Sequence, residues 1–450
     1  MGNRSSRTTW SPDGWQRLEA RHQPDYPDQT AYQAVLEQLA TLPPIVFPGE
    51  IVQLRGRIAE AAAGRQFILH GGDCVERFID CTPQTITNKL KILLQMSVIL
   101  SHAARRPVLR IGRIAGQYFK PRSAAFETIA GRTVPTYRGD TINGYAADQR
   151  EPDPERLLKG YFHATATLNY IRSMIDGGFA DLHQPYSWNL HSIEQTHRWG
   201  EYRAIVDHIL DAIHFMESFG GLRNENLGRI DFYTSHEGLH LGYERALTRP
   251  EGERWYDTSA HLLWIGERTR DRAQAHVEFF RGVSNPIGVK LSATAEPRDI
   301  VALARELDPD GEAGRLMLIT RLGEEQVRGR LPDLIEAVAS AGLDVAWMCD
   351  PMHGNTTTLA GGRKTRDFDS VLGELDATFE VHRAAGTHLA GVHFELTGDD
   401  VTECTGGALE LAERDLEARY ESYCDPRLNY AQSLEMAFLI SRFLREQRPG

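Results

Sequence analysis

Hydrophobic residues are concentrated in eight short runs along the chain, and these runs recur at intervals of about 25 to 45 residues with one longer exception. Within each run the apolar residues are nearly continuous rather than alternating with polar ones, which is typical of parallel strands covered on both faces. In chain order the runs cover residues 65–74, 107–116, 229–237, 261–270, 286–292, 314–323, 344–355 and 389–398. This pattern predicts eight buried parallel strands.

Amphipathic segments with helical spacing separate most of the runs. The stretch EEQVRGRLPDLIEAVASAG (residues 324–342) places Leu331, Leu334 and Val338 on one face and ends at Gly342, a residue type that commonly stops a helix. One helix after each of eight strands is the repeat of the (β/α)₈ TIM barrel. The sequence therefore predicts an α/β fold of this kind, with its active groups at the carboxyl ends of the strands.

Two regions depart from this repeat. Residues 1–60 contain several prolines among short helical stretches and are interpreted as an N-terminal extension, so that the catalytic barrel occupies residues 61–450. The connection from the second run to the third is too long for one strand–helix unit. We therefore expect a helical insertion at about residues 145–227, between the second and third barrel strands.

An extra helix pair is expected within the insertion. The first helix, at residues 153–178, would have Asp153 at its N-cap and Pro154 at its first helical position. A second helical pattern lies near residues 201–219. Both segments carry wide apolar stripes, which are explained either by packing on the barrel or by an oligomeric or regulatory interface.

The overall composition is that of an ordinary globular protein, with 41% hydrophobic and 25% charged residues. No run of about 18 apolar residues is present, so no membrane span is expected. The formal net charge of −12 argues against nucleic-acid binding, although local clusters of Lys and Arg can still bind small anions. The five cysteines are scattered and odd in number, which favours free thiols in a reducing cytoplasm over a disulfide framework.

Potential metal ligands stand at the ends of runs that are distant in the sequence. The first run ends in GGDC with Cys74, the seventh in DPMHGN with His353, and the eighth carries Glu395. Asp425 stands at the entry to the last helical segment. Each residue alone is more often a structural group, but a closed barrel would bring all four to one rim. A thiolate, an imidazole and two carboxylates suit Mn²⁺, Fe²⁺, Co²⁺ or Zn²⁺ better than Mg²⁺ or Ca²⁺.

Basic residues are also concentrated at strand ends and in the loops that follow them. They are Arg113, Lys120, Arg122, Arg268, Lys290, Arg321, Lys364 and Arg366. Cations at the ends of apolar strands are costly unless they are paired. Solvation at the surface explains any one of them, but a series that faces one mouth indicates a phosphorylated substrate, with two or more anionic groups to bind.

With these motifs the chain resembles a known family, the type II 3-deoxy-D-arabino-heptulosonate 7-phosphate (DAHP) synthases. The matching stretches are GGDC (71–74), GRIAGQYFKPRS (112–123), YRGD (137–140), TSHE (234–237), WIGERTR (264–270), NPIGVK (285–290), DPMHGNT (350–356), KTR (364–366), HFELTGDDVTEC (393–404) and DPRLN (425–429). They are long, occur in order and span roughly residues 30 to 445, so the resemblance covers most of the chain.

The resemblance implies a metal site and two substrate sites. Mn²⁺, with Co²⁺ or another divalent transition metal as a substitute, would be held by Cys74, His353, Glu395 and Asp425. Phosphoenolpyruvate would be bound by Arg113, Lys120, the backbone of Glu267, Arg268, Lys290 and Arg321. Erythrose 4-phosphate would be bound by Arg122, Ser123, Lys364 and Arg366. Cys74 and His353 are expected to take part in catalysis as ligands, and Lys120 as an acid.

The implied reaction is the first step of the shikimate pathway, which leads to chorismate and the aromatic amino acids. C3 of phosphoenolpyruvate attacks the aldehyde of erythrose 4-phosphate, water adds at C2, and phosphate leaves to give DAHP. A metal ion would act as a Lewis acid on the aldehyde oxygen, and Lys120 or a metal-bound water would protonate the forming alkoxide. The family forms homo-oligomers, so a dimer or tetramer is expected, and some members associate with chorismate mutase.

Three alternatives remain open at the level of the sequence. The same chemistry could serve a secondary pathway, either toward phenazine-type products or with an amino analogue of the sugar. A different barrel enzyme, such as a metal-dependent aldolase, would not release phosphate from phosphoenolpyruvate. A non-catalytic regulatory or scaffold protein on this fold would be favoured by the loss of a ligand or an anion-binding residue, and none is lost at the motif positions.

Overall fold

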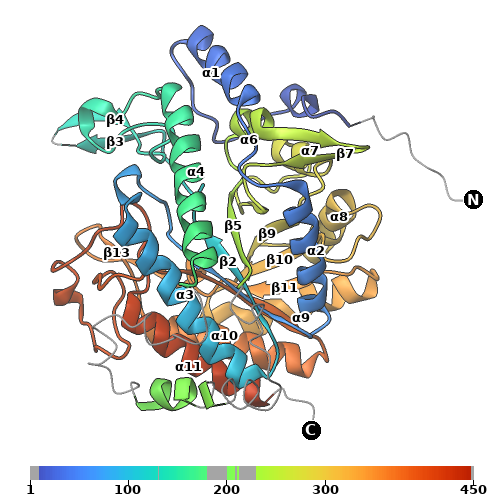
Figure 1. Cartoon of the computed structure of the whole chain (residues 1–450), viewed down its shortest axis with the longest axis vertical. Helices are drawn as coiled ribbons and strands as arrows, with labels where there is room; N and C mark the ends of the chain where they lie inside the picture. Colours follow the sequence, from blue (N-terminus) through green and yellow to red (C-terminus); the bar gives the residue numbers. More distant parts are fainter. Residues whose placement is uncertain (1–9, 130, 180–199, 208–209, 212–229, 447–450) are drawn as a thin grey trace, which may run out of the picture.

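Parallel strands form a closed barrel in this computed structural model, which describes residues 10–129, 131–179, 200–207, 210–211 and 230–446 (Figure 1). Within that part of the chain the barrel strands are β1 (Phe67–Gly72), β2 (Val108–Arg113), β5 (Phe232–Glu237), β8 (Leu262–Ile265), β9 (Ile287–Ser292), β10 (Leu316–Arg321), β11 (Ala346–Cys349) and β14 (Leu389–Glu395). The barrel closes at β1, where Gly72 is paired with Arg113 of β2 and with Glu395 of β14. All eight predicted strands and the TIM-barrel fold are confirmed.

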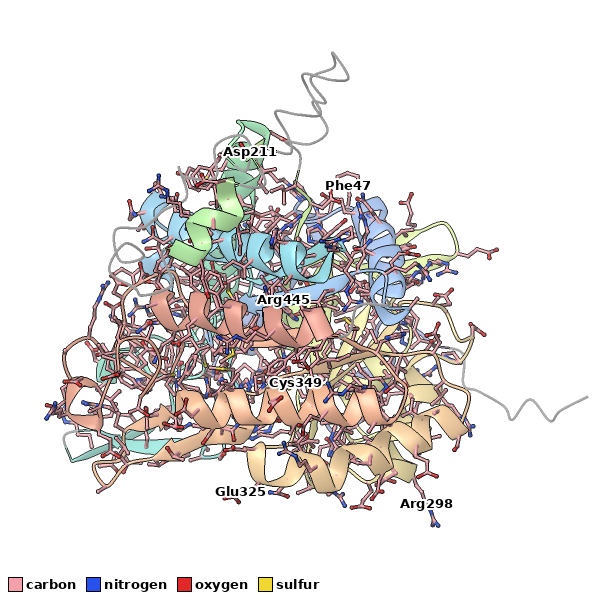
Figure 2. All side chains as sticks on the ribbon, turned by 90° about the horizontal axis from the view of Figure 1, so that it is seen from below. Phe47, Asp211, Arg298, Glu325, Cys349 and Arg445 are labelled. Carbon is pink, nitrogen blue, oxygen red and sulfur yellow. The ribbon has the colours of Figure 1, made fainter. Side chains whose placement is uncertain are left out.

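Helices cover the outside of the barrel, as the alternating pattern predicted. They include α3 (Pro83–Ala104), α7 (Ala275–Phe280), α8 (Pro297–Leu307), α9 (Glu324–Ser340), α10 (Phe368–Ala384) and α11 (Tyr430–Glu446). Helix α9 confirms the predicted helix at 324–342, and Gly342 follows it with a left-handed φ of 66°. Figure 2 shows Cys349, at the end of β11, in the interior, whereas Arg298 and Glu325 lie at the surface. None of the helices in the described residues is long and apolar enough to cross a membrane.

The N-terminal segment closes the amino-terminal end of the barrel. It contains a short 3₁₀ helix, η1 (Gly14–Arg17), followed by α1 (Gln29–Thr41) and α2 (Pro48–Ala62). Leu54 and Ile58 on α2 are fully buried, and they pack with side chains near the amino-terminal ends of the strands, such as Ile68 and Met317. This packing fills one end of the barrel with apolar groups and leaves the carboxyl end for polar chemistry. The division of the chain at residue 60 stays a prediction.

The long connection between β2 and β5 contains both expected and unexpected elements. Helix α4 (Glu155–Asp176) confirms the first predicted helix, although it begins one residue later, with Pro154 at the N-cap and the Asp153 carboxylate accepting a hydrogen bond from the Glu155 amide at 3.0 Å. A hairpin of β3 (Phe126–Ile129) and β4 (Arg132–Pro135) precedes it and was not predicted. Of the second predicted helix, residues 200–207 are helical, and most of the remainder lies outside the described residues. The helix pair therefore stays a prediction.

Candidate active site

A cavity of about 180 Å³ lies at the carboxyl ends of the barrel strands. Described Lys and Arg side chains dominate its wall, together with His353 and a few carboxylates. The basic residues are Arg113, Lys120, Arg268, Lys290, Arg321 and Lys364, and the carboxylates are Glu237, Glu267 and Asp425. All of these except Glu237 are among the residues predicted from the sequence. The excess of positive charge suits the cavity to molecules with more than one anionic group.

The four predicted metal ligands come together at the edge of this cavity. Donor atoms of Cys74, Glu395 and Asp425 all lie within 4.8 Å of one another. The Nε2 atom of His353 lies 3.1 Å from Oε1 of Glu395. Cys74 and Glu395 are fully buried, and they are neighbours because β1 and β14 pair along their length. Sulfur, nitrogen and carboxylate oxygen grouped in this way are the donor set of a divalent transition-metal site.

Asp350 orients the imidazole of His353 and is a residue that the sequence analysis did not assign. Its Oδ2 lies 2.7 Å from Nδ1 of His353, and its Oδ1 accepts hydrogen bonds from the backbone amides of Met352 and His353. A proton on Nδ1 leaves the Nε2 lone pair directed at Glu395, which is the arrangement used by histidines that bind metals. Burial alone would raise the pKa of Asp350, but His353 and Lys290 beside it hold that pKa well below its usual range. A carboxylate three residues before a candidate ligand is the signal that could have revealed it.

The ammonium group of Lys120 lies inside the ligand cluster. Its Nζ is 2.9 Å from Sγ of Cys74, 2.8 Å from Oδ2 of Asp425 and 3.8 Å from Oε1 of Glu395. Burial opposes the charge on Lys120, yet the surrounding anions raise its pKa well above its usual value. Burial raises the pKa of the Cys74 thiol well above its ordinary value, and the hydrogen bond with Cys424 acts in the same direction. The cluster therefore already contains one cation, the ammonium of Lys120. Its donor atoms also suit a divalent metal ion, which would bind in place of the proton on the Cys74 thiol.

Three of the other residues expected to bind phosphoenolpyruvate, Lys290, Arg321 and Glu267, also line the cavity. Lys290 forms a buried ion pair with Asp350, and burial lowers the pKa of Lys290 to about 8. Arg321 donates a hydrogen bond to the backbone carbonyl of His353 at 3.1 Å. The carboxylate of Glu267 accepts hydrogen bonds from the backbone amide and the hydroxyl of Ser292, at 2.8 and 2.9 Å. The Glu267 side chain is therefore engaged at the end of β9, in agreement with a role for its backbone.

A second chamber of about 230 Å³ adjoins the first and contains most of the residues expected to bind erythrose 4-phosphate. Arg122, Ser123 and Lys364 line it, and it shares Lys120 and Lys364 with the first cavity. Arg268 spans the two chambers and is exposed, with Nη1 donating to the Pro121 carbonyl and Nη2 to the Ser123 hydroxyl, each at 3.0 Å. A phosphate bound here would meet cations from three separate segments of the chain.

Arg366 lies behind the site rather than in its wall. It is fully buried on β13 (Lys364–Arg366), and its Nη2 lies 2.7 Å from Oε2 of Glu395. Its Nε donates to the Thr356 hydroxyl on the paired strand β12 (Thr356–Thr358) at 2.9 Å. It does not line either chamber in the described structure. This placement favours orientation of Glu395 over direct contact with a sugar phosphate.

Glu237 and Gln117 line the cavity as well, and the sequence analysis gave neither a role. Burial raises the pKa of Glu237, which ends β5 within the TSHE stretch. The Gln117 side-chain carbonyl accepts a hydrogen bond from the Glu237 backbone amide at 2.9 Å. The position of Glu237 at a strand end is the same signal that identified the cations.

A (β/α)₈ barrel with a mixed sulfur, nitrogen and oxygen cluster beside a cation-lined cavity defines an enzyme that acts on small anionic substrates. The model of the Class-II DAHP synthetase family matches residues 10–441. The chain belongs to this family. The family match and the site agree on the same stretches of sequence, since all the residues that surround the cavity lie within the matched range.

Three curated relatives support the assignment, and each is named phospho-2-dehydro-3-deoxyheptonate aldolase. The protein from Neurospora crassa is 46% identical over 98% of this chain and 95% of its own length. The protein from Streptomyces coelicolor is 48% identical over 96% and 97%, and that from Mycolicibacterium smegmatis is 44% identical over 95% and 93%. A crystal structure of a DAHP synthase from Thermotoga maritima aligns with a TM-score of 0.33 and 13% identity over 85% of this chain and 68% of that chain.

Proposed function

We propose that the two adjoining chambers bind phosphoenolpyruvate and erythrose 4-phosphate and that the chain condenses them with water to DAHP and phosphate. This is the opening step of the shikimate pathway, and it matches the family and the names of the relatives. The observation that carries the proposal is the contact between the cation-lined cavity and the cluster of Cys74, Glu395 and Asp425. Such a contact places an anionic substrate next to a site that can polarise a second one.

Phosphoenolpyruvate carries a carboxylate and a phosphate, and the main cavity offers cations for both. Arg113, Lys290 and Arg321 come from three different strands, so a planar acid held among them is fixed in orientation as well as in place. The two substrates repel each other, and the shared cations Lys120, Arg268 and Lys364 between the chambers offset that repulsion. Holding the two reacting carbons together is itself a large part of the rate acceleration.

We infer that Cys74, His353, Glu395 and Asp425 would hold Mn²⁺ or a similar divalent transition metal. When bound there, the ion would supply Lewis-acid polarisation of the aldehyde oxygen of erythrose 4-phosphate. Asp350 would keep Nε2 of His353 free for ligation, and Arg366 would orient Glu395 from behind. The raised pKa of Lys120 keeps its ammonium protonated, so this residue is the proposed donor of a proton to the forming alkoxide.

The water that adds to C2 must lose a proton, and Glu237 is the proposed acceptor. Among the three carboxylates of the described residues that line the cavity, Glu267 accepts a hydrogen bond from Ser292, and Asp425 forms ion pairs with Lys120 and Lys364. Glu237 faces the cavity with a pKa raised by burial, which makes it a better base than an ordinary exposed carboxylate. Once the C–O bond of the phosphate breaks, Lys290 and Arg321 remain to stabilise the departing anion.

A coupled assay tests the function directly. Purified protein is freed of metal with a chelator, supplied with Mn²⁺, and given phosphoenolpyruvate with and without erythrose 4-phosphate, while phosphate and DAHP are both measured. We expect equal amounts of the two products, and only when both substrates and the metal are present. Phosphate release without the sugar phosphate, or full activity in metal-free protein, would contradict the proposal. Replacing the sugar phosphate by its amino analogue tests the secondary-pathway alternative.

We propose a homodimer or homotetramer that can associate with chorismate mutase in the cytoplasm, on the basis of the resemblance. Exposed aromatic side chains support an interface, since Phe47, Phe126 and Phe162 have 67%, 61% and 54% of their surface exposed. The described cysteines, Cys74, Cys81, Cys349, Cys404 and Cys424, are all free thiols, which supports a reducing compartment. Light scattering of the chain alone and with added chorismate mutase measures both states of assembly.

A further inference from the structure

Inside the barrel, below the cavity, a line of hydrogen bonds runs from Arg113 through three side chains that have no role in the site described above. Nη1 of Arg113 lies 2.6 Å from Nε2 of His393, and Nδ1 of His393 lies 3.0 Å from Nδ1 of His70. Nε2 of His70 lies 2.7 Å from the hydroxyl of Ser235, which in turn donates to the Gly112 carbonyl at 2.9 Å. His70, Ser235 and His393 are fully buried and come from β1, β5 and β14.

The chemistry of the two ends determines the direction of every hydrogen bond in this line. A guanidinium can only donate, so Nε2 of His393 must accept and therefore carries no proton. His393 must then carry its proton on Nδ1 and donate it to Nδ1 of His70. His70 consequently carries its own proton on Nε2 and donates to Ser235, whose single hydroxyl proton goes to the Gly112 carbonyl. The opposite direction would set an N–H of His393 against an N–H of Arg113.

The packing around these rings holds the same arrangement. The ring of Trp264 lies 5.6 Å from that of His70 and 5.3 Å from that of His393, both in edge-to-face geometry. Cζ of Arg113 lies 5.1 Å above the same indole. Burial lowers the pKa of His70 well below its ordinary value, which agrees with a neutral ring in the middle of the line. Every donor in the line therefore has an acceptor, and the rings are prevented from rotating.

The remaining contacts of Arg113 explain why neutral partners matter. Its Nε donates to the Asp73 carbonyl at 2.9 Å, and its Nη2 donates to the Cys74 carbonyl at 3.1 Å and to the Glu395 carboxylate at 3.0 Å. Of these acceptors and His393, only Glu395 is charged, and Glu395 belongs to the metal cluster. Arg113 is thus oriented mainly by groups that leave its positive charge uncompensated. A carboxylate in place of His393 would orient it equally well but would cancel the charge that a substrate anion needs.

We propose that His393, His70 and Ser235 are positioning residues that hold Arg113 toward phosphoenolpyruvate while keeping its charge available. This inference rests on the proposed role of Arg113 in substrate binding. In this arrangement His393 carries its ring proton on Nδ1, and His70 carries its ring proton on Nε2. None of the three residues is among the described residues that line the two chambers, so their effect would reach the reaction through Arg113.

The tautomers of His70 and His393 provide the first test, which does not require a measurement of enzyme activity. Protein with ¹⁵N-labelled histidine is examined by nuclear magnetic resonance at neutral pH, and ring-nitrogen shifts separate a protonated from an unprotonated nitrogen. The His70→Asn variant assigns the His70 signals by their loss. We expect one neutral ring with the proton on Nδ1, in contact with another that carries it on Nε2. A positively charged His393, or one with its proton on Nε2, would overturn the proposal.

Kinetics with a matched pair of variants provides the second test. His70→Leu removes both hydrogen bonds, whereas His70→Asn keeps a short side chain that can accept and donate. In the Leu variant we expect the KM for phosphoenolpyruvate to rise about tenfold, with the KM for erythrose 4-phosphate unchanged, and we expect most of this loss to be recovered in the Asn variant. Equal changes in the two KM values, or no change in either, would refute a positioning role. If His70→Leu does not fold, Ser235→Ala against Ser235→Thr makes the same comparison.

The outcomes separate this inference from the proposed function. Unmodified protein that releases no phosphate from phosphoenolpyruvate would contradict the function, and the nitrogen shifts would still report the hydrogen-bond line. Active protein in which the His70 and Ser235 variants leave both KM values unchanged would contradict only the positioning role.

Discussion

Nζ of Lys120 lies 2.9 Å from the sulfur of Cys74, so a residue proposed as an acid and a residue proposed as a metal ligand are direct partners. The contact places a positive charge beside a thiol whose pKa is raised by burial. It also means that Lys120 and a metal ion would share the same two partners, Cys74 and Asp425. The metal affinity and the proton on Lys120 are therefore linked, and both can be measured.

Mn²⁺ is expected to bind more tightly as the pH rises. The raised pKa of Cys74 keeps its thiol protonated at neutral pH, so binding must release that proton, and a higher pH makes its loss easier. The dissociation constant should fall about tenfold for each pH unit from about pH 6 to 8. Calorimetry in two buffers with different ionisation enthalpies measures the affinity and the released proton together. Cys74→Ser should abolish the pH dependence, and Cys81→Ser, which alters a thiol near Thr167, should leave it intact.

Lys120→Met should have opposite effects on metal binding and on turnover. Loss of the ammonium removes a cation that repels the metal and competes for Asp425, so Mn²⁺ should bind about tenfold more tightly or better. Turnover should fall by a factor of about 10² to 10⁴, because the proposed proton donor is gone. Titration with Mn²⁺ and steady-state kinetics give the two values on one preparation. Weaker metal binding together with low turnover would show instead that Lys120 only organises the cluster.

Arg268→Ala should weaken the binding of phosphoenolpyruvate while leaving the fold intact. Arg268 is exposed and donates hydrogen bonds to Pro121 and Ser123, so its loss should not prevent folding. We expect the KM for phosphoenolpyruvate to rise by roughly tenfold. Arg272→Ala is the matched control, since Arg272 lies in the same loop region but pairs with Glu306 at 2.8 Å and does not line the cavity of the described structure. The same KM in both variants would count against the role of Arg268.

The binding of phosphoenolpyruvate should weaken above about pH 8 because Lys290 loses its charge there. Burial lowers the pKa of Lys290 to about 8, so its ammonium is present at neutral pH and absent in alkaline solution. The KM for phosphoenolpyruvate should rise with pH through that value, and Lys290→Arg should move the rise to a higher pH, since a guanidinium stays charged. The sign for stability is opposite: the unfolded chain binds more protons between about pH 8 and 10.5, so this group adds stability as the pH rises. A flat KM profile from pH 7 to 9 would contradict the assignment.

Much of the fold and of the candidate metal site could be predicted from the sequence. Buried parallel strands consist of nearly continuous apolar runs, and all eight runs became barrel strands. Cys74, His353 and Glu395 were recognisable because a reactive residue at the end of such a run must lie on the carboxyl face of a barrel. The hairpin of β3 and β4 could not be predicted, since four-residue strands with mixed polar and apolar residues leave little periodic signal.

Other features were decided only by the tertiary structure. The sequence predicts that Arg366 contacts substrate, yet its side chain is fully buried beside Glu395. The line of hydrogen bonds from Arg113 to Ser235 depends on which side chains meet across the barrel, and its partners are up to 323 residues apart in the sequence. The local sequence pattern indicates whether a residue is buried and at which end of a strand it lies. It does not indicate which hydrogen-bond donor faces which acceptor, because that pairing is set when the barrel closes.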